Sequence, residues 1–293
     1  MNFKEFTDRI VLLLQEGLGD NYKVTLTKVL KNNDIRLTGV VIMEESDSMS
    51  PTIYLEEPYR RYQDGVSVQE ILEEIRALYK AHAFNSKFDM DFFRDFSLVE
   101  SRICHKVISY EKNQELLKDV PWFKWHDLAI TFYYAMEDPA IGRASVMIHN
   151  NHLDMWGKPS EEIYRIADRN MRFRMPDLLL PMHMLLEEML GTKTEGEELS
   201  LYVLTNRNKI YGASAMLYSE KMKLLANRLH SDLLILPSSV HEVLLMPDEG
   251  RQEYDFYRQM VKEVNITQVD PEEILSFSLY RYDREKAEIE EIL

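Results

Sequence analysis

Cysteine is almost absent from this sequence of 293 residues, and its scarcity excludes two kinds of structure. Cys104 is the single cysteine, so no disulfide can form within the chain, and zinc modules built from several cysteines are excluded. A chain of this kind is suited to a reducing compartment. We therefore expect a cytoplasmic protein.

Long apolar runs are also missing. The first twenty residues carry charged side chains inside the apolar pattern, unlike the uninterrupted apolar stretch of a secretory signal. The richest apolar stretch, residues 178–190, is broken by a proline, a histidine and two glutamates. No stretch reaches the about 18 apolar residues that a membrane-spanning helix needs. We expect neither secretion nor a membrane span.

Basic residues are outnumbered, with 35 Lys and Arg against 50 Asp and Glu and a formal net charge of -15. Such a charge opposes binding to phosphate backbones and to anionic lipid surfaces. We therefore expect neither bulk nucleic acid nor a membrane as a partner. A protein or a small molecule is left as the partner.

The common signatures of enzymes are absent as well. The sequence has no Gly-x-Ser-x-Gly, no Walker A loop, no Gly-x-Gly-x-x-Gly and no His-Glu-x-x-His. His126-Asp127 is a lone pair at the start of a predicted strand, whereas a metal site needs three or four converging ligands. We predict no cofactor and no metal site.

The residues that are present form a chain typical of a folded globular protein, with 45% hydrophobic, 29% charged and 11% aromatic residues. Its length is that at which single cores begin to split into two domains. At Pro121 a helix-rich, charged sequence gives way to long apolar runs. This change indicates an N-terminal helix-hairpin-helix region, 1–121, and a C-terminal α+β domain, 122–293, unless the two form one continuous domain.

The N-terminal region contains clear local signals. Apolar residues recur at helical spacing over 3–14, which predicts a first helix. Residues 22–30 and 35–43 are partly alternating, β-branched runs separated by a short polar turn, which predicts a hairpin. Ser67-Val-Gln-Glu70 has the capping-box spacing, so we expect a second helix that ends near His82.

The remainder of the chain mixes hairpins with helices. We predict helices over 160–171, 219–230 and 252–264. We predict strands over 103–110, 128–136, 144–148, 199–205, 210–217, 233–236, 243–246 and 276–282. This pattern lacks regular βαβ alternation and ends in a β-β-α-β-β-α-β order. It predicts an α+β fold with a mainly antiparallel sheet flanked by helices, in which 122–293 form one sheet.

The densest polar cluster beside a predicted strand is Pro237-Ser238-Ser239-Val240-His241-Glu242. It connects two short strands, so its side chains emerge from a rigid scaffold at a turn. Ser238 or Ser239 could be a nucleophile with His241 as its base, or His241 and Glu242 could hold a metal or anchor a ligand, with Ser238 and Ser239 as further ligand-binding candidates. Alternatively, the serines form turn hydrogen bonds, His241 packs and Glu242 is solvated.

Two groups of basic and aromatic residues are notable in so acidic a chain. These are Tyr59-Arg60-Arg61-Tyr62 and a second group with Arg169, Arg172, Phe173 and Arg174. Either could bind a phosphate or an acidic partner. The plainer interpretation is that these arginines pair with the abundant carboxylates and cover apolar surface.

Several segments resemble a bacterial family described as domain of unknown function 5688, found mostly in Gram-positive anaerobes. The matching segments are 106–113, 126–134, 202–206, 211–213, 232–243 and 273–276. The resemblance implies that the Pro-Ser-Ser-x-His-Glu turn is a feature of the family. It implies no activity, cofactor or partner.

Three functions follow as hypotheses. The first is a cytoplasmic, non-catalytic binding or regulatory protein, because no catalytic constellation is recognisable. The second is a hydrolase that uses Ser239 and His241, with Glu242 or a distant carboxylate in support. The third is an acidic immunity or anti-defence protein that mimics nucleic acid by its negative charge.

Overall fold

The structure is a computed structural model that describes residues 1–45, 50–82, 90–138, 142–191, 200–250 and 253–292. The chain divides into two compact units. The first contains Met1–Lys31, Ile35–Phe93 and Glu137–Ala144, and the second contains Asn32–Asp34, Arg94–Met136 and Ser145–Leu293. Pro121 lies inside the second unit, so a domain boundary at this proline stays a prediction.

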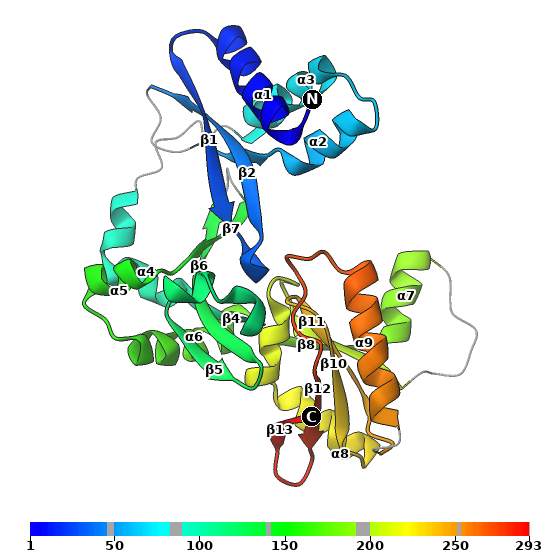
Figure 1. Ribbon diagram of the computed structural model, residues 1–293. Coiled ribbons are helices and arrows are strands. Elements are labelled where there is room, and N and C mark those ends of the chain that lie inside the picture. Colours follow the sequence, from blue (N-terminus) through cyan, green and yellow to red (C-terminus); the bar gives the residue numbers. More distant parts are fainter. Residues whose placement is uncertain (46–49, 83–89, 139–141, 192–199, 251–252, 293) are drawn as a thin grey trace. The chain divides into compact units, whose positions relative to one another are not determined.

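The first unit combines a three-stranded antiparallel sheet with helices (Figure 1). Its elements are α1 (Phe3–Leu18), β1 (Tyr22–Leu30), β2 (Arg36–Glu44), β3 (Thr52–Tyr54), α2 (Glu56–Gln63) and α3 (Val68–His82). Asn2 and Glu5 form a capping box that satisfies free amides at the start of α1. Phe6, Ile10 and Leu14 recur on one face of α1 and are fully buried in the core of this unit.

The strands β1 and β2 form the predicted hairpin, with Tyr22 opposite Glu44 and Leu30 opposite Arg36. Between them lies η1 (Asn32–Asp34), in which Asn33 has a left-handed backbone. The three residues of η1 belong to the second unit, although both strands belong to the first. The hairpin is confirmed, and its turn lies in the other unit.

The first sheet of the second unit is antiparallel and is built around β6 (Leu128–Asp138). It pairs with β4 (Ile103–Ser109), β5 (Trp122–Trp125) and β7 (Gly142–Met147). The helices α4 (Phe96–Val99), α5 (Asn150–Trp156) and α6 (Ser160–Arg174) accompany it, together with 3-10 turns η2 (Met90–Arg94), η3 (Glu100–Arg102), η4 (Glu111–Asn113) and η5 (Leu116–Lys118). In the register, Cys104 lies opposite Tyr133 and Lys106 opposite Thr131.

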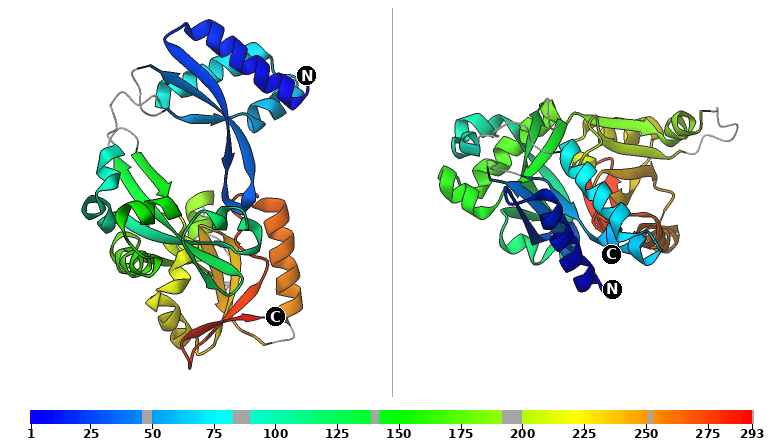
Figure 2. Two further views of the ribbon diagram at one scale, coloured as in Figure 1. Left: turned by 60° about the vertical axis from the view of Figure 1, so that its left-hand side comes forward. Right: turned by 90° about the horizontal axis from the view of Figure 1, so that it is seen from above.

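The second sheet has six strands in the order β13-β12-β10-β11-β9-β8, and all neighbours are antiparallel. Its strands are β8 (Asp177–Pro181), β9 (Tyr202–Asn206), β10 (Leu233–Ser239), β11 (Glu242–Pro247), β12 (Leu279–Asp283) and β13 (Glu288–Ile292). The associated helices are α7 (Met182–Leu190), η6 (Gly212–Leu217), α8 (Glu220–Leu229) and α9 (Tyr254–Gln268). Figure 2 shows α9 lying along this sheet, where Val261 packs on Leu234 and Leu236.

The α+β class with antiparallel sheets is confirmed, and two details of the prediction are wrong. The described strands of 122–293 lie in two sheets rather than one, because β5, β6 and β7 pair with β4 from before Pro121. The predicted strand 210–217 is the 3-10 helix η6, whose residues from Gly212 to Met216 are buried. Gly212 at the start of η6 packs directly against the β10–β11 turn.

Helix length and polarity bear on membrane insertion. Among the helices of the described residues, none is both long and apolar enough to cross a bilayer.

Candidate functional site

The predicted turn joins β10 to β11 in the second unit. Ser238 is half-buried near the end of β10, and Ser239 is buried. The Ser239 hydroxyl accepts a hydrogen bond from the backbone amide of His241 at 3.0 Å. Glu242 begins β11 and lies opposite Ser239 after a register shift. Ser239 therefore stabilises the turn, as a serine two residues ahead of an amide commonly does.

The His241 imidazole is bound by protein groups at both nitrogens. Its Nδ1 accepts a hydrogen bond from the Tyr211 amide at 3.1 Å, and its Nε2 lies 3.3 Å from Oε1 of Glu273. Because Nδ1 is the acceptor, the neutral ring carries its proton on Nε2, the nitrogen that lies near Glu273. The ring also stacks on Tyr211, with centroids 5.7 Å apart and planes inclined by 10°.

Tyr211 is the centre of this arrangement. It has a left-handed backbone with φ of 51°, a conformation that costs energy for a bulky residue and is often retained at functional sites. The face of its ring is 4.4 Å from Nζ of Lys106, and its centroid is 5.1 Å from that of Tyr133. Its hydroxyl is 3.4 Å from that of the exposed Ser145. We call Tyr211, His241, Lys106 and Ser145 the Tyr211 cluster.

Glycine is required beside Tyr211. A Cβ atom on Gly212 would be 2.4 Å from the His241 carbonyl oxygen and 2.8 Å from the Asn206 amide nitrogen, and both are backbone atoms. The same His241 carbonyl accepts a hydrogen bond from Thr205 Oγ1 at 2.8 Å. The sequence therefore places the β9–η6 loop directly on the β10–β11 turn.

Sequence reasoning found His241 and did not find Tyr211, Lys106, Thr205 or Glu273. Tyr211-Gly212 was available as a signal, because glycine next to an aromatic residue often marks a close backbone approach. Lys106 gave no local signal. It is buried on β4 at 6% exposure, and only the fold brings it to the Tyr211 ring.

The His126-Asp127 pair noticed in the sequence is held by neighbouring side chains. Asp127 accepts hydrogen bonds from the hydroxyls of Tyr280 and Ser276, and the His126 ring lies against Trp125 and Tyr280. In the part of the chain that the structure describes, no three His, Cys, Asp or Glu side chains are grouped so that they could hold a metal ion.

Burial makes two residues of β4, Cys104 and His105, poorly reactive. Burial raises the pKa of the Cys104 thiol to about 12, which keeps it protonated and poorly nucleophilic. Burial also lowers the pKa of His105 to about 3, so its imidazole is neutral at neutral pH.

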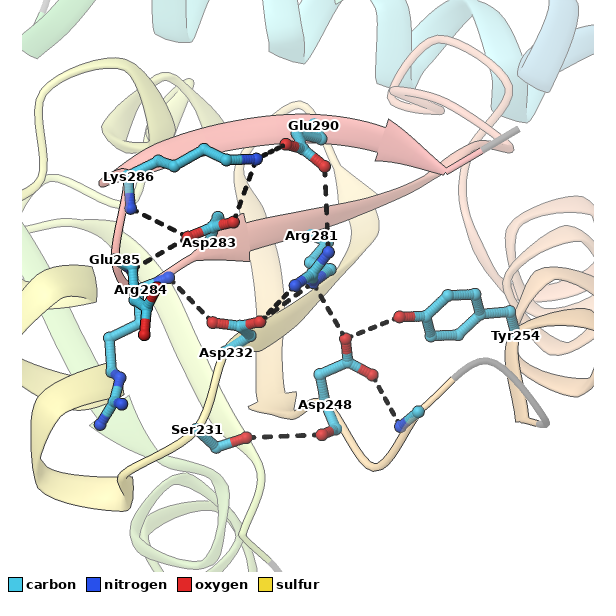
Figure 3. Close-up of polar contacts among 11 residues, drawn as sticks. Ser231, Asp232, Asp248, Tyr254, Arg281, Asp283, Arg284, Glu285, Lys286 and Glu290 are labelled. Atoms are coloured by element: carbon cyan, nitrogen blue, oxygen red, sulfur yellow. Dashed lines mark hydrogen bonds and ion pairs between the residues drawn. The ribbon is translucent and has the colours of Figure 1, made fainter.

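A separate polar network surrounds Arg281 (Figure 3). The guanidinium is 2.5 Å from Asp232 and 3.3 Å from Asp248, and Glu290 follows at 3.9 Å. Asp248 also accepts a hydrogen bond from the Tyr254 hydroxyl at 2.6 Å. These groups come from the ends of β10 and β11, from β12, from β13 and from α9, so the network fastens the edge of the six-stranded sheet.

Two carboxylates in this region, Asp232 and Asp283, have lowered pKa values. Hydrogen bonds from the Arg284 amide and from the Arg281 side chain lower the pKa of Asp232. The pKa of Asp283 is lowered in the same way by the Lys286 amide. Carboxylates that are already satisfied by protein donors favour a structural role over ligand binding.

Fold and site together define a class: an α+β protein of two units, whose second unit carries the Tyr211 cluster next to the β10–β11 turn. Residues 3–284 match the model of a family of unknown function (DUF5688), and the chain belongs to this family. No curated protein and no solved structure matches the chain.

Proposed function

We propose that the protein is a cytoplasmic, non-catalytic binding protein, and that the Tyr211 cluster contacts its partner. One observation supports this proposal above others: Nδ1 of His241 accepts from the Tyr211 amide, and its Nε2 lies 3.3 Å from the Glu273 carboxylate. The histidine acts as a positioning residue that holds Tyr211 in its left-handed conformation. Tyrosine held rigidly beside a cation is typical of residues that contribute strongly to interfaces.

The geometry weighs against the alternative of a hydrolase. A nucleophilic serine needs its hydroxyl directed at an unoccupied imidazole nitrogen. Here the Ser239 hydroxyl accepts from the His241 amide, while Nδ1 of that histidine accepts from Tyr211. A Ser239–His241 reaction would first have to break the contacts that hold the turn together.

Labelling with a fluorophosphonate probe tests the absence of serine catalysis. We expect wild-type protein and Ser239→Ala to be labelled equally weakly, because the hydroxyl is buried and engaged. Labelling that is strong in wild-type protein and lost in Ser239→Ala would establish the hydrolase instead.

Photo-crosslinking in cells tests the binding surface. We expect p-benzoylphenylalanine at position 145, next to the Tyr211 hydroxyl, to give a defined adduct that Tyr211→Ala abolishes. The same group at the exposed position 16 on α1 serves as the control and should give no such adduct. An adduct at 145 that persists in Tyr211→Ala, or no adduct at 145, would contradict the proposal.

Hydrogen exchange tests the positioning role of His241. His241→Ala should raise the exchange rate of the Tyr211 amide by at least about fivefold, because the amide loses its acceptor, worth about 1 kcal/mol or more. His241→Asn offers a carbonyl acceptor and should restore part of the protection. A Tyr211 amide that is equally protected in all three proteins would show that His241 has no such role.

A further inference from the structure

A second feature of the second unit lies outside the Tyr211 cluster. A cleft of about 410 Å³ is lined by residues of β5, β6, α6, η6, α8, β12 and β13. Its volume falls within the about 300 to 1,000 Å³ typical of small-molecule pockets. Every lining residue belongs to the second unit, so the cleft is a property of one compact body.

Aromatic residues contribute to the wall, with Trp125 and Tyr164 half-buried and Tyr218 and Tyr282 buried behind the surface. Trp125, Tyr164, Tyr218 and Tyr282 all line the cleft, beside apolar side chains such as Ile130 and Met222. Flat aromatic walls favour flat ligands, because offset stacking contributes about 0.5 to 1.5 kcal/mol beyond the burial of area.

These walls are held in place from behind. The ring of Tyr164 is stacked on the fully buried His105, with centroids 6.3 Å apart, and is met edge-on by Phe123 at 5.1 Å. Tyr218 meets the same histidine edge-on, and its hydroxyl donates a hydrogen bond to the Met175 carbonyl at 2.7 Å. A ligand would therefore meet preformed walls and would pay little for ordering them.

Two cations lie among the lining residues of the cleft in an otherwise acidic protein. Arg172 of α6 and Lys223 of α8 are both exposed, and Glu220 is the one acid among the residues that line it. The single ion pair recorded for Arg172 within the described chain is with Asp168 at 3.9 Å, too long for a strong hydrogen bond. Its planar guanidinium thus retains donors for a bidentate contact with a carboxylate or phosphate.

From this combination we infer that the cleft binds a small molecule with a planar ring and an anionic group, either carboxylate or phosphate. The ring stacks against Tyr164, and the anion is bound by Arg172 and Lys223. This inference goes beyond the proposed partner surface, because it rests on different residues and a different kind of ligand.

Four probes test this inference by calorimetry and by tryptophan fluorescence, since Trp125 is part of the wall. Adenosine 5′-monophosphate carries a ring and a phosphate, and indole-3-acetate carries a ring and a carboxylate. Adenosine supplies the ring alone, and inorganic phosphate supplies the anion alone. We expect at least one of the first two to bind with a Kd below about 1 mM, and each of the last two to bind at least about tenfold more weakly.

Matched variants on α6 locate the binding. Arg172→Glu should weaken the bound probe by about tenfold or more, whereas Arg169→Glu, an exposed arginine outside the cleft on the same helix, should leave Kd within about twofold. Melting temperatures of both variants confirm that they are folded. The inference is overturned if neither ring-bearing anion binds saturably, or if Arg172→Glu and Arg169→Glu bind the probe equally.

Discussion

At the scale of single residues, His105 is the most unusual side chain of the second unit. It is fully buried, and neither ring nitrogen has a hydrogen-bond partner among the described residues. The folded protein consequently keeps this imidazole neutral, with a pKa of about 3, whereas an unfolded chain binds a proton near pH 6.5. The contribution of His105 to the free energy of unfolding is therefore complete above pH 6.5 and is lost as the pH falls toward 3.

We predict that His105→Phe flattens the pH dependence of stability. The wild-type protein should lose up to about 1.4 kcal/mol per pH unit from this group between pH 6 and pH 4, because only its unfolded state takes up the proton. Phenylalanine removes that proton and keeps the stacking with Tyr164. Urea unfolding at pH 7, 5.5 and 4.5 measures the effect, with the exposed His230→Asn as a control that should retain the wild-type slope. Parallel curves for His105→Phe and wild-type protein would contradict the prediction.

Residue-level reasoning anticipated part of the site. The turn was recognisable because several short polar side chains follow one another between two apolar strands. The role of its members was not, since it depends on Tyr211 and Glu273, which are distant in sequence and contribute an amide and a carboxylate. The structure also gives Ser239 a structural hydrogen bond, which a sequence pattern alone cannot distinguish from activation.

At the scale of elements, the hairpin and the long helices were predictable because their signals are local. Several elements of the second unit were not, and three of them show the reasons. Prolines near both ends of β8 resemble breakers, yet an edge strand tolerates them because one side of it needs no donors. The glutamates of β13 obscure its strand pattern in the sequence. β13 is the second edge strand of the sheet, and charged side chains on an edge strand discourage pairing with other chains. In η6, small residues such as Ala213 and Ser214 carry no periodicity that separates helix from strand.

We predict that Gly212→Ala is costly and Gly17→Ala is not. The added methyl group at 212 would meet backbone atoms of two neighbouring segments, which cannot move away cheaply, so we expect a loss of about 1 to 3 kcal/mol. At Gly17 the methyl group would meet only the flexible end of the Arg76 side chain, and alanine favours helix by about 1 kcal/mol. Denaturant unfolding distinguishes the two, and similar stabilities of both variants would be the contrary result.

At the scale of the whole molecule, the second unit depends on residues from the tip of the β1–β2 hairpin. The Asn33 side chain donates hydrogen bonds to the carbonyls of Pro271 at 2.7 Å and Ile274 at 2.8 Å. The backbone amide of Asn33 donates to Asn113 Oδ1 at 2.7 Å, and the side-chain amide of Asn113 donates to Asn33 Oδ1 at 3.0 Å. Asn113 is fully buried, so these bonds satisfy an amide that water cannot reach.

We predict that Asn33→Gly and Asn33→Ala differ in stability in a defined order. Glycine tolerates the left-handed backbone with φ of 61° and removes only the side-chain hydrogen bonds, for a loss of about 1 to 3 kcal/mol. Alanine loses the same bonds and adds about 1 kcal/mol of backbone strain. Urea unfolding followed by tryptophan fluorescence reports on the second unit, which contains Trp122, Trp125 and Trp156. Equal stability of wild-type protein and Asn33→Gly would contradict the role of the side chain.

The position of this tip in the chain has a consequence for synthesis on the ribosome. The partners of Asn33 are translated 80 residues later at Asn113 and 241 residues later at Ile274. While the ribosome makes that intervening stretch, the hairpin strands can already pair locally, yet the two carbonyl acceptors of the Asn33 side chain are made only 238 and 241 residues later. Truncated or stalled products that end before Pro271 therefore lack both carbonyl acceptors of the Asn33 side chain, and their hairpin tip cannot make the bonds that it makes in the folded second unit.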